Sequence, residues 1–224
     1  METVLITGAD RGIGAALARQ YRDRGDRTIA ACLGDGAHLV AEGFEVAPNV
    51  DVTDMASLSG LAERLQDTTI TILVSNAGAF APERWREFDY ASLLHVYDVN
   101  ALGPLRVVDA LMPRLAAGSR IGIITSRVGS LSENSSGGLY GYRMSKCAAN
   151  MLGINLYHEL RPHGIAVMLL HPGQVATAMT RGVSGGGDFI TPEMSAAGLI
   201  EQLDALHSGT PPEFRHSDGT LLPW

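Results

Sequence analysis

The sequence predicts a single α/β domain with a doubly wound parallel sheet and helices on both faces. Short apolar runs alternate with amphipathic stretches along the whole chain, the pattern of repeated βαβ units. Several of these runs, such as TVLIT, TILVS, IGIIT and IAVMLL, are almost continuously apolar, as strands are when helices cover both sides. The length of 224 residues suits one domain, and no linker or repeat divides it, so we expect residues 1–224 to form one unit.

The predicted elements follow one another regularly. Strands are expected at residues 4–7, 27–32, 44–47, 70–75, 120–125 and 165–171, and helices at residues 13–24, 55–66, 90–115, 141–161 and 192–205. Asp54 can cap the second helix, and Thr191-Pro192 is a favourable start for the last. The Gly/Ser-rich stretches 130–138 and 182–187 both follow strands, so we expect them to form walls of a pocket at the carboxyl ends of the strands.

Composition and charge limit the possible partners. The formal net charge of −7 argues against a nucleic acid or an anionic membrane surface as partner. No apolar run approaches the roughly 18 residues of a membrane span, and the N-terminus lacks the pattern of a secretion signal. Cys32 and Cys147 have neither disulfide nor metal-ligand spacing. We therefore expect a cytoplasmic protein that acts on a small molecule without a metal.

A glycine-rich loop joins the first predicted strand to the first predicted helix. It reads Thr7-Gly8-Ala9-Asp10-Arg11-Gly12-Ile13-Gly14. Glycines permit a tight turn and close approach of the backbone, and the helix start offers free N–H groups to a pyrophosphate. A glycine cluster alone also occurs in ordinary turns, but its place between strand and helix favours a dinucleotide site.

The only lysine of the chain, Lys146, lies four residues after Tyr142 on a predicted helix, whereas the chain has sixteen arginines. That spacing places both side chains on one helix face. An ammonium and a positive nicotinamide ring favour the phenolate, so we expect a lowered pKa for Tyr142. A lysine left by compositional drift is the alternative, which this spacing disfavours. Ser126 can donate to a substrate oxygen, unless it only satisfies backbone groups at a strand end.

The loop spacing T-G-x-x-x-G-x-G resembles that of the short-chain dehydrogenase/reductase family, and the family's other motifs appear in order over essentially the whole chain. These matches are Asp51-Val52, Asn76-Ala77-Gly78, Asn100, Ser126, Tyr142 with Lys146, and the segment with Pro172, Gly173, Val175 and Thr177. The Tyr-Arg-Met-Ser-Lys motif and the ending 218–224 resemble the branch of C-factor and sniffer-type carbonyl reductases.

The resemblance implies a Rossmann-type fold and an NAD(P)-dependent oxidoreductase that reduces a ketone or aldehyde to an alcohol. It gives Tyr142, Lys146, Ser126 and Asn100 catalytic roles. The cofactor would be bound by the loop residues Gly8, Asp10, Arg11, Gly12, Ile13 and Gly14, by Asp51 and Val52 at the adenine, by Asn76, Ala77 and Gly78, by Tyr142 and Lys146, and by Pro172, Gly173, Val175 and Thr177 at the nicotinamide. It also implies a homodimer or homotetramer through helices 90–115 and 141–161. A cofactor-binding regulatory protein with little or no turnover is the alternative.

The cofactor type depends on the end of the second strand, where an acidic residue would favour NAD. Cys32 and Leu33 occupy that place, while Arg11 matches a basic residue of NADP-type members. Asp35 is close enough to act as an acidic substitute. These residues favour NADP(H) over NAD(H). Ser126 and Tyr142 lie 16 positions apart, more than in many family members, so the substrate stays open.

Overall fold

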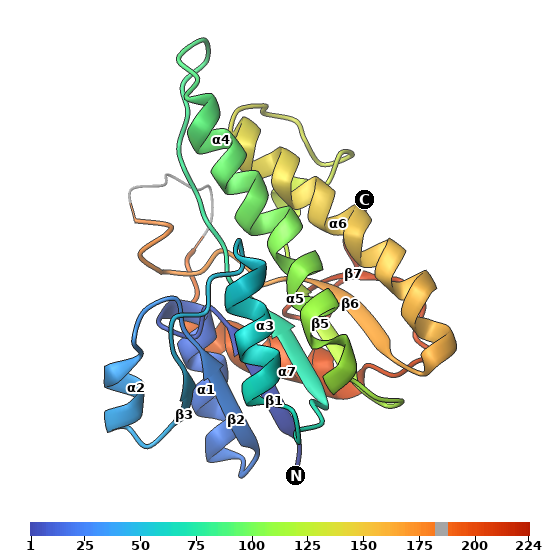
Figure 1. Ribbon diagram of the computed structural model, residues 1–224. Helices are drawn as coiled ribbons and strands as arrows, with labels where there is room; N and C mark the ends of the chain where they lie inside the picture. The colour runs from blue at the N-terminus through green and yellow to red at the C-terminus, as the bar shows by residue number, and fades with distance from the viewer. Residues whose placement is uncertain (182–187) are drawn as a thin grey trace.

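The computed structural model describes residues 1–181 and 188–224 (Figure 1). In this part of the chain, seven parallel strands form one sheet in the order β3-β2-β1-β4-β5-β6-β7. The strands are β1 (Thr3–Thr7), β2 (Arg27–Ala31), β3 (Glu45–Ala47), β4 (Ile72–Ser75), β5 (Arg120–Ile124), β6 (Ala166–His171) and β7 (Phe214–His216). The strand order changes direction between β1 and β4, and such a switch point is where open α/β sheets bind ligands.

Helices cover both faces of the sheet. They are α1 (Gly12–Asp23), α2 (Ala37–Ala41), α3 (Met55–Arg64), α4 (Tyr90–Tyr97), α5 (Gly103–Leu111), α6 (Tyr140–Leu160) and α7 (Pro192–Ala205). Figure 1 shows α3, α5 and α6 in front of the sheet and α7 behind it. Successive residues of β1 enter opposite cores: Leu5 packs with α3, α5 and α6, and Ile6 packs with α1 and α7. Strands buried on both faces explain the continuous apolar runs of the sequence.

The structure confirms the predicted fold class and most of the predicted elements. The helix at residues 192–205 has the predicted bounds, and the other elements differ at their ends. Sequence patterns missed α2 and β7, which are only five and three residues long. Elements this short contain too few residues to show a period.

The expected helix 90–115 is wrong as one continuous helix. A π-helical turn, Asp98–Leu102, separates α4 from α5, and a 3₁₀ turn, Met112–Arg114, follows α5. Pro104 gives the physical reason, because it has no N–H to donate to the carbonyl of Asn100 four residues earlier. The helix widens at this point, and the altered turn is where Asn100 lies.

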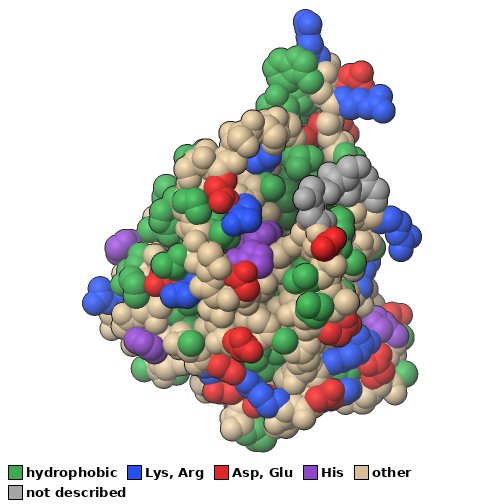
Figure 2. Space-filling model, turned by 180° about the vertical axis from the view of Figure 1, so that it is seen from behind, with side chains coloured by type: hydrophobic (Ala, Val, Ile, Leu, Met, Phe, Trp, Pro, Cys, Tyr) green, Lys and Arg blue, Asp and Glu red, His purple; other side chains and the backbone are tan. Residues whose placement is uncertain are grey.

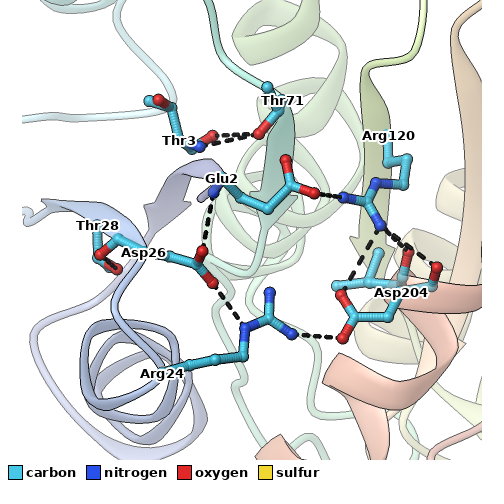
Figure 3. Close-up of polar contacts among 9 residues, drawn as sticks. Glu2, Thr3, Arg24, Asp26, Thr28, Thr71, Arg120 and Asp204 are labelled. Carbon is cyan, nitrogen blue, oxygen red and sulfur yellow. Dashed lines mark hydrogen bonds and ion pairs between the residues drawn. The ribbon is translucent and has the colours of Figure 1, made fainter.

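Charged residues at the amino-terminal edge of the sheet pair with one another (Figure 3). Arg120 at the start of β5 contacts Glu2 and Asp204. Arg24 pairs with Asp26 at 2.7 Å and also with Asp204, and the Glu2 N–H donates to Asp26 at 2.8 Å. The network joins β1, β5, the end of α1 and α7, and it leaves the Arg120 side chain only 13% exposed. Each basic side chain is paired with acidic ones, so we expect the network to stabilise the folded protein.

Candidate active site

Ser126 and Tyr142 are brought together by a close contact between two elements. Ser126 follows β5 and begins a 3₁₀ turn, Arg127–Gly129, which packs on α6. A Cβ on Gly129 would lie 2.7 Å from the carbonyl carbon of Lys146 and 2.9 Å from the nitrogen of Cys147. Real Cβ atoms do not approach backbone so closely, so only glycine allows this contact. Gly129 therefore sets the separation between Ser126 and α6, the helix that carries Tyr142 and Lys146.

Three of the four side chains expected to be catalytic, those of Ser126, Tyr142 and Lys146, lie together at the carboxyl-terminal edge of the sheet. The Lys146 Nζ is 5.6 Å from the centre of the Tyr142 ring and donates to the Ile124 carbonyl at 2.9 Å. Lys146 is 4% exposed and Ser126 is 8% exposed. Such buried polar groups are found at sites where they perform chemistry, because burial otherwise costs free energy.

Burial shifts the pKa values of both Tyr142 and Lys146. It raises the pKa of Tyr142 to about 12, and the Ser126 hydroxyl, which can hydrogen-bond to the phenolate, acts in the opposite direction. Burial also lowers the pKa of Lys146 to about 8. Desolvation therefore dominates in the protein without a cofactor, and the lowering of the Tyr142 pKa that we expect beside a positive nicotinamide ring stays a prediction. At neutral pH Tyr142 carries its proton.

Asn100 lies close to the site but binds the backbone. It is 1% exposed, and its side-chain amide exchanges two hydrogen bonds of 2.8 Å with the N–H and the carbonyl of Ala79. Its Nδ2 also donates to the Ser145 hydroxyl at 3.0 Å, which in turn donates to the Tyr142 carbonyl at 2.8 Å. Asn100 thus links the segment after β4 to the helix that carries Tyr142.

The glycine-rich loop is supported by the segment after β4. A Cβ on Gly8 would lie 2.8 Å from the Ala77 Cα, and one on Gly14 would lie 2.3 Å from the Gly8 carbonyl oxygen. Asn76 donates to the carbonyls of Thr7 and Gly8 at 3.0 and 3.1 Å. Asn76 and Ala77 therefore support the glycine-rich loop, while Gly78 lies exposed beside Asn100.

The start of α1 fits a pyrophosphate. Arg11 precedes the helix with extended backbone, and among the described residues no side chain caps the first N–H groups at Gly12 and Ile13. Free N–H groups and the positive end of the helix dipole are what an anion needs. The Thr177 methyl lies 3.4 Å from the Cβ position of Gly12, which has a φ of +57°. The two segments expected to bind the cofactor thus lie next to each other.

Beyond β6, Pro172, Gly173 and Val175 form the wall that continues to Thr177. The Pro172 carbonyl accepts from the hydroxyls of Ser195 and Ser217, at 2.7 and 3.2 Å, and Gly173 has a φ of +88°. Val175 is buried and bridges to Ile190. The expected wall at residues 182–187 lies outside the described residues. Residues 130–138 are tied to α6 by Arg143, which donates to the Val128 carbonyl at 3.2 Å and the Ser136 hydroxyl at 3.0 Å.

The Asp10 carboxylate, which the resemblance placed among the cofactor-binding residues, also makes a contact that the sequence did not reveal. Asp10 accepts from the N–H groups of Leu33 and Gly34 at 3.1 and 3.3 Å, so it binds the turn after β2. Asp35 caps its own turn by accepting from Ala37 at 3.0 Å. Burial and Asp10 raise the pKa of Cys32 to about 11, so this thiol stays protonated. No sequence signal showed that the glycine loop and the turn after β2 share a carboxylate.

The two residues predicted to contact adenine, Asp51 and Val52, follow β3. Asp51 accepts from the N–H and the hydroxyl of Thr53 at 2.8 and 2.7 Å. Val52 is buried, and its Cγ2 lies 2.9 Å from the Cβ position of Gly103 in α5. Asp51 therefore shapes its own turn, and Val52 packs this turn against the core.

The described part of the chain contains neither a metal-ligand cluster nor a membrane-spanning helix. Acidic and basic side chains are interspersed on the face shown in Figure 2. Within residues 1–181 and 188–224, no three His, Cys, Asp or Glu side chains are arranged to hold a metal ion. No helix of this described part is long and apolar enough to cross a membrane.

An anion cradle at the start of α1, together with a buried serine, a buried lysine and a partly buried tyrosine at the same edge of the sheet, is typical of dinucleotide-dependent oxidoreductases. The chain belongs to the short-chain dehydrogenase/reductase family, since the family model described as short chain dehydrogenase matches residues 2–186. It is 48% identical over 226 residues to 1-hydroxy-2-glutathionyl-2-methyl-3-butene dehydrogenase of Rhodococcus sp. (strain AD45), covering 100% of both chains. It is 40% identical over 161 residues to C-signal of Myxococcus xanthus, covering 69% of this chain and 93% of the relative.

Solved structures agree with these relatives. The NADPH-bound carbonyl reductase from chicken fatty liver has a TM-score of 0.89 at 27% identity, covering 100% of this chain and 99% of that one. A carbonyl reductase of Pseudomonas aeruginosa PAO1 in complex with NADP has a TM-score of 0.85 at 31% identity, with full coverage of both chains. The expected family and its carbonyl-reductase branch are thus confirmed.

Proposed function

We propose that this oxidoreductase interconverts a carbonyl compound and an alcohol with a nicotinamide cofactor, using Tyr142 as the general acid and base. The observation that carries the proposal is the Tyr142 phenol, which lies within hydrogen-bond reach of Ser126 and has the Lys146 Nζ 5.6 Å from the centre of its ring. A pure binding module needs the cradle but not this phenol. The intact set therefore favours an enzyme over the regulatory alternative.

The bound cofactor supplies or accepts the hydride, and the side chains of the chain manage the proton. Ser126 orients the substrate oxygen by a hydrogen bond, and Tyr142 donates its proton to that oxygen as negative charge develops. A phenol whose pKa is raised to about 12 carries a proton to donate at neutral pH. Lys146 provides a point charge that stabilises the phenolate left behind. In the oxidative direction the same groups take the proton from an alcohol.

The relative from Rhodococcus sp. (strain AD45), which aligns with the whole chain, indicates a substrate class to test. That protein is named as a dehydrogenase of an alcohol carrying a glutathionyl group, and it shares 48% identity with this chain. We therefore propose that glutathionyl alcohols belong in the first substrate panel, together with simple ketones and aldehydes. Reduction is supported by the carbonyl reductases among the structural neighbours.

NADP(H) is the proposed cofactor. Arg11 is exposed at the start of α1, where its forked donors can bind a 2′-phosphate, and two of the neighbouring structures hold NADP or NADPH. Asp10 and Asp35 oppose it, because carboxylates near the ribose repel that phosphate. Two backbone N–H groups already bind the Asp10 carboxylate and reduce its effect.

We also propose a homodimer or homotetramer in the cytoplasm. Apolar side chains of α4 and α6 are exposed: Leu94 at 69%, Met144 at 54% and Met151 at 59%. Exposed apolar groups on two adjacent helices are typical of an interface between subunits. Light scattering at micromolar concentrations tests this, and a mass near 23.7 kDa would contradict it.

The function is tested by following nicotinamide absorbance over a panel of carbonyl and alcohol substrates with each cofactor. Turnover that disappears in Tyr142→Phe, with cofactor binding unchanged, is the expected result. Absence of turnover in the wild-type protein with every substrate, despite tight cofactor binding, would favour the regulatory alternative.

A further inference from the structure

A short segment after β4, residues 79–83, crosses over the start of the catalytic helix; we call it the crossing segment. Its first residue is fixed, because Asn100 binds both the N–H and the carbonyl of Ala79 at 2.8 Å. Its second residue, Phe80, places its ring edge-on to the Tyr142 ring, with centroids 5.3 Å apart. Its last residue, Glu83, reaches α6. The segment therefore contacts the catalytic tyrosine and is held at both ends.

Glu83 caps the helix that carries Tyr142. Its Oε1 accepts from the Gly141 N–H at 2.8 Å, across 58 positions of sequence. The residue before the helix, Leu139, has left-handed backbone with a φ of 50° and provides no side-chain cap. A carboxylate at a helix start satisfies a free N–H and is stabilised by the helix dipole. Glu83 thus supplies from a distant segment what the local sequence lacks.

Gly141 makes this contact possible. A Cβ at that position would lie 2.8 Å from the Glu83 Oε1 and 2.6 Å from the Leu93 Cδ2. Gly141 immediately precedes Tyr142, so the capped N–H belongs to the peptide next to the catalytic residue. A shift of Glu83 relative to α6 would therefore move the first turn of this helix, from which the Tyr142 side chain projects.

The second oxygen of Glu83 carries a cost. Its Oε2 is buried and has no hydrogen-bond partner among the described residues. A buried oxygen without a donor loses the hydrogen bonds that it would make in water, so a residue selected for packing alone would avoid it. Tolerated costs of this kind concentrate at functional sites, where geometry matters more than stability.

We propose that Glu83 is a positioning residue for catalysis, which acts through Gly141 to fix the first turn of α6 and so the place of the Tyr142 phenol. In this role Glu83 acts through the helix and not through a contact with substrate or cofactor. Together with Asn100 it keeps the crossing segment, and with it Phe80, against the tyrosine ring. The inference rests on the proposed role of Tyr142 as general acid and base.

Glu83→Ala removes the cap and tests the proposal by a split between kinetic constants. We expect kcat to fall about ten- to a hundredfold, because small displacements of a reacting group have effects of this size. The cofactor KM should not change, since Glu83 lies away from the glycine-rich loop. Glu83→Gln keeps an acceptor of the same shape and should recover most of kcat. Glu87→Ala is the matched control, because Glu87 is an exposed acid of the same loop and should leave kcat unchanged.

Two results would overturn the proposal: a kcat for Glu83→Ala within about twofold of wild type, or a Glu83→Gln variant no better than Glu83→Ala. If Glu83→Ala does not fold, Gly141→Ala is the second variant. Its Cβ would push the Glu83 carboxylate away from the N–H of residue 141, while alanine itself favours the helix. That variant should also lose at least about tenfold in kcat with cofactor binding intact, and an unchanged kcat would overturn the proposal.

The two proposals fail in different ways. If Tyr142→Phe keeps its turnover, the proposed function is wrong whatever Glu83 does. If Tyr142→Phe is inactive while Glu83→Ala is fully active, only the positioning role is wrong. Cofactor binding followed by fluorescence provides a readout that does not depend on turnover in either case.

Discussion

The two edges of the sheet use polar groups in opposite ways. At the amino-terminal edge, Glu2, Arg24 and Arg120 are each paired with an opposite charge. At the carboxyl-terminal edge, Lys146 has no acidic partner among the described residues and binds only the carbonyl of Ile124. Charges that are already paired with each other bind a ligand weakly, whereas a buried cation without an acidic partner can still bind a ligand.

The difference teaches where stability and function are divided in this fold. Side chains at the amino-terminal edge tie elements together, so their loss should change unfolding and leave turnover unaffected. Side chains at the carboxyl-terminal edge are buried at a cost, so their loss should change turnover more than stability. Each prediction below tests one side of this comparison.

The largest effect is expected from Tyr142→Phe, which removes one oxygen and keeps the ring. Turnover should fall by about 10²–10⁴-fold, because general acid catalysis is worth that much. Cofactor affinity and melting temperature should stay close to wild type, as measured by fluorescence titration and thermal unfolding. A variant that keeps more than about a tenth of the rate would show that Tyr142 is not the proton donor.

A loss almost as large is expected for Lys146→Arg, in spite of the conserved charge. Lys146 is 4% exposed, and a planar guanidinium cannot occupy the place of a compact ammonium beside the Ile124 carbonyl. We expect kcat to drop at least about a hundredfold, close to the value for Lys146→Ala. Steady-state kinetics of both variants check this, and an active arginine variant would contradict the need for a point charge.

Cofactor choice gives an intermediate effect at the same edge. Arg11→Ala should weaken NADPH binding about ten- to a hundredfold and NADH binding little, because a charge-assisted contact to phosphate is worth roughly 1.5–3 kcal/mol. Asp10→Asn is the matched opposite change and should favour NADPH, since it removes a negative charge. The ratio of kcat/KM for the two cofactors measures both. Equal loss of both cofactors in Arg11→Ala would mean that Arg11 only shapes the loop.

At the amino-terminal edge, Arg120→Ala should reduce stability and not activity. The side chain is 13% exposed, and its removal leaves Glu2 without its basic partner and Asp204 with Arg24 alone. We expect the free energy of unfolding to fall by about 1–3 kcal/mol in denaturant titrations, with kcat unchanged. A reduced kcat in the folded variant would show that the two edges are coupled.

The smallest effect concerns acid pH. Hydrogen bonding by Thr71 and the charge of Arg120 hold the pKa of Glu2 below its usual 4.5, against burial. A carboxylate whose folded pKa is depressed stabilises the protein fully above its unfolded pKa, and this contribution is lost as the pH falls through the folded pKa. Melting temperatures measured from pH 6 downward should therefore fall less steeply for Glu2→Gln than for wild type. Identical slopes would place the acid sensitivity elsewhere.

The sequence by itself determined the features that depend on local spacing. The alternation of apolar runs and amphipathic stretches predicted the parallel sheet, because buried strands and covering helices impose their own periods. The spacing of four positions from Tyr142 to Lys146 places both on one helix face whatever surrounds them. The spacing of Gly8, Gly12 and Gly14 likewise predicted the cradle that the backbone forms at α1.

Tertiary structure alone decided the features that depend on contacts between distant segments. The capping of α6 by Glu83 spans 58 positions, and the contact of Asp10 with Leu33 joins two separate loops. Neither has a pattern that can be recognised along the chain. Burial raises the pKa of Tyr142 to about 12, an effect that the sequence could not show, because burial is a property of the packed molecule. Local spacing placed the reacting groups on their elements, and packing set their environment.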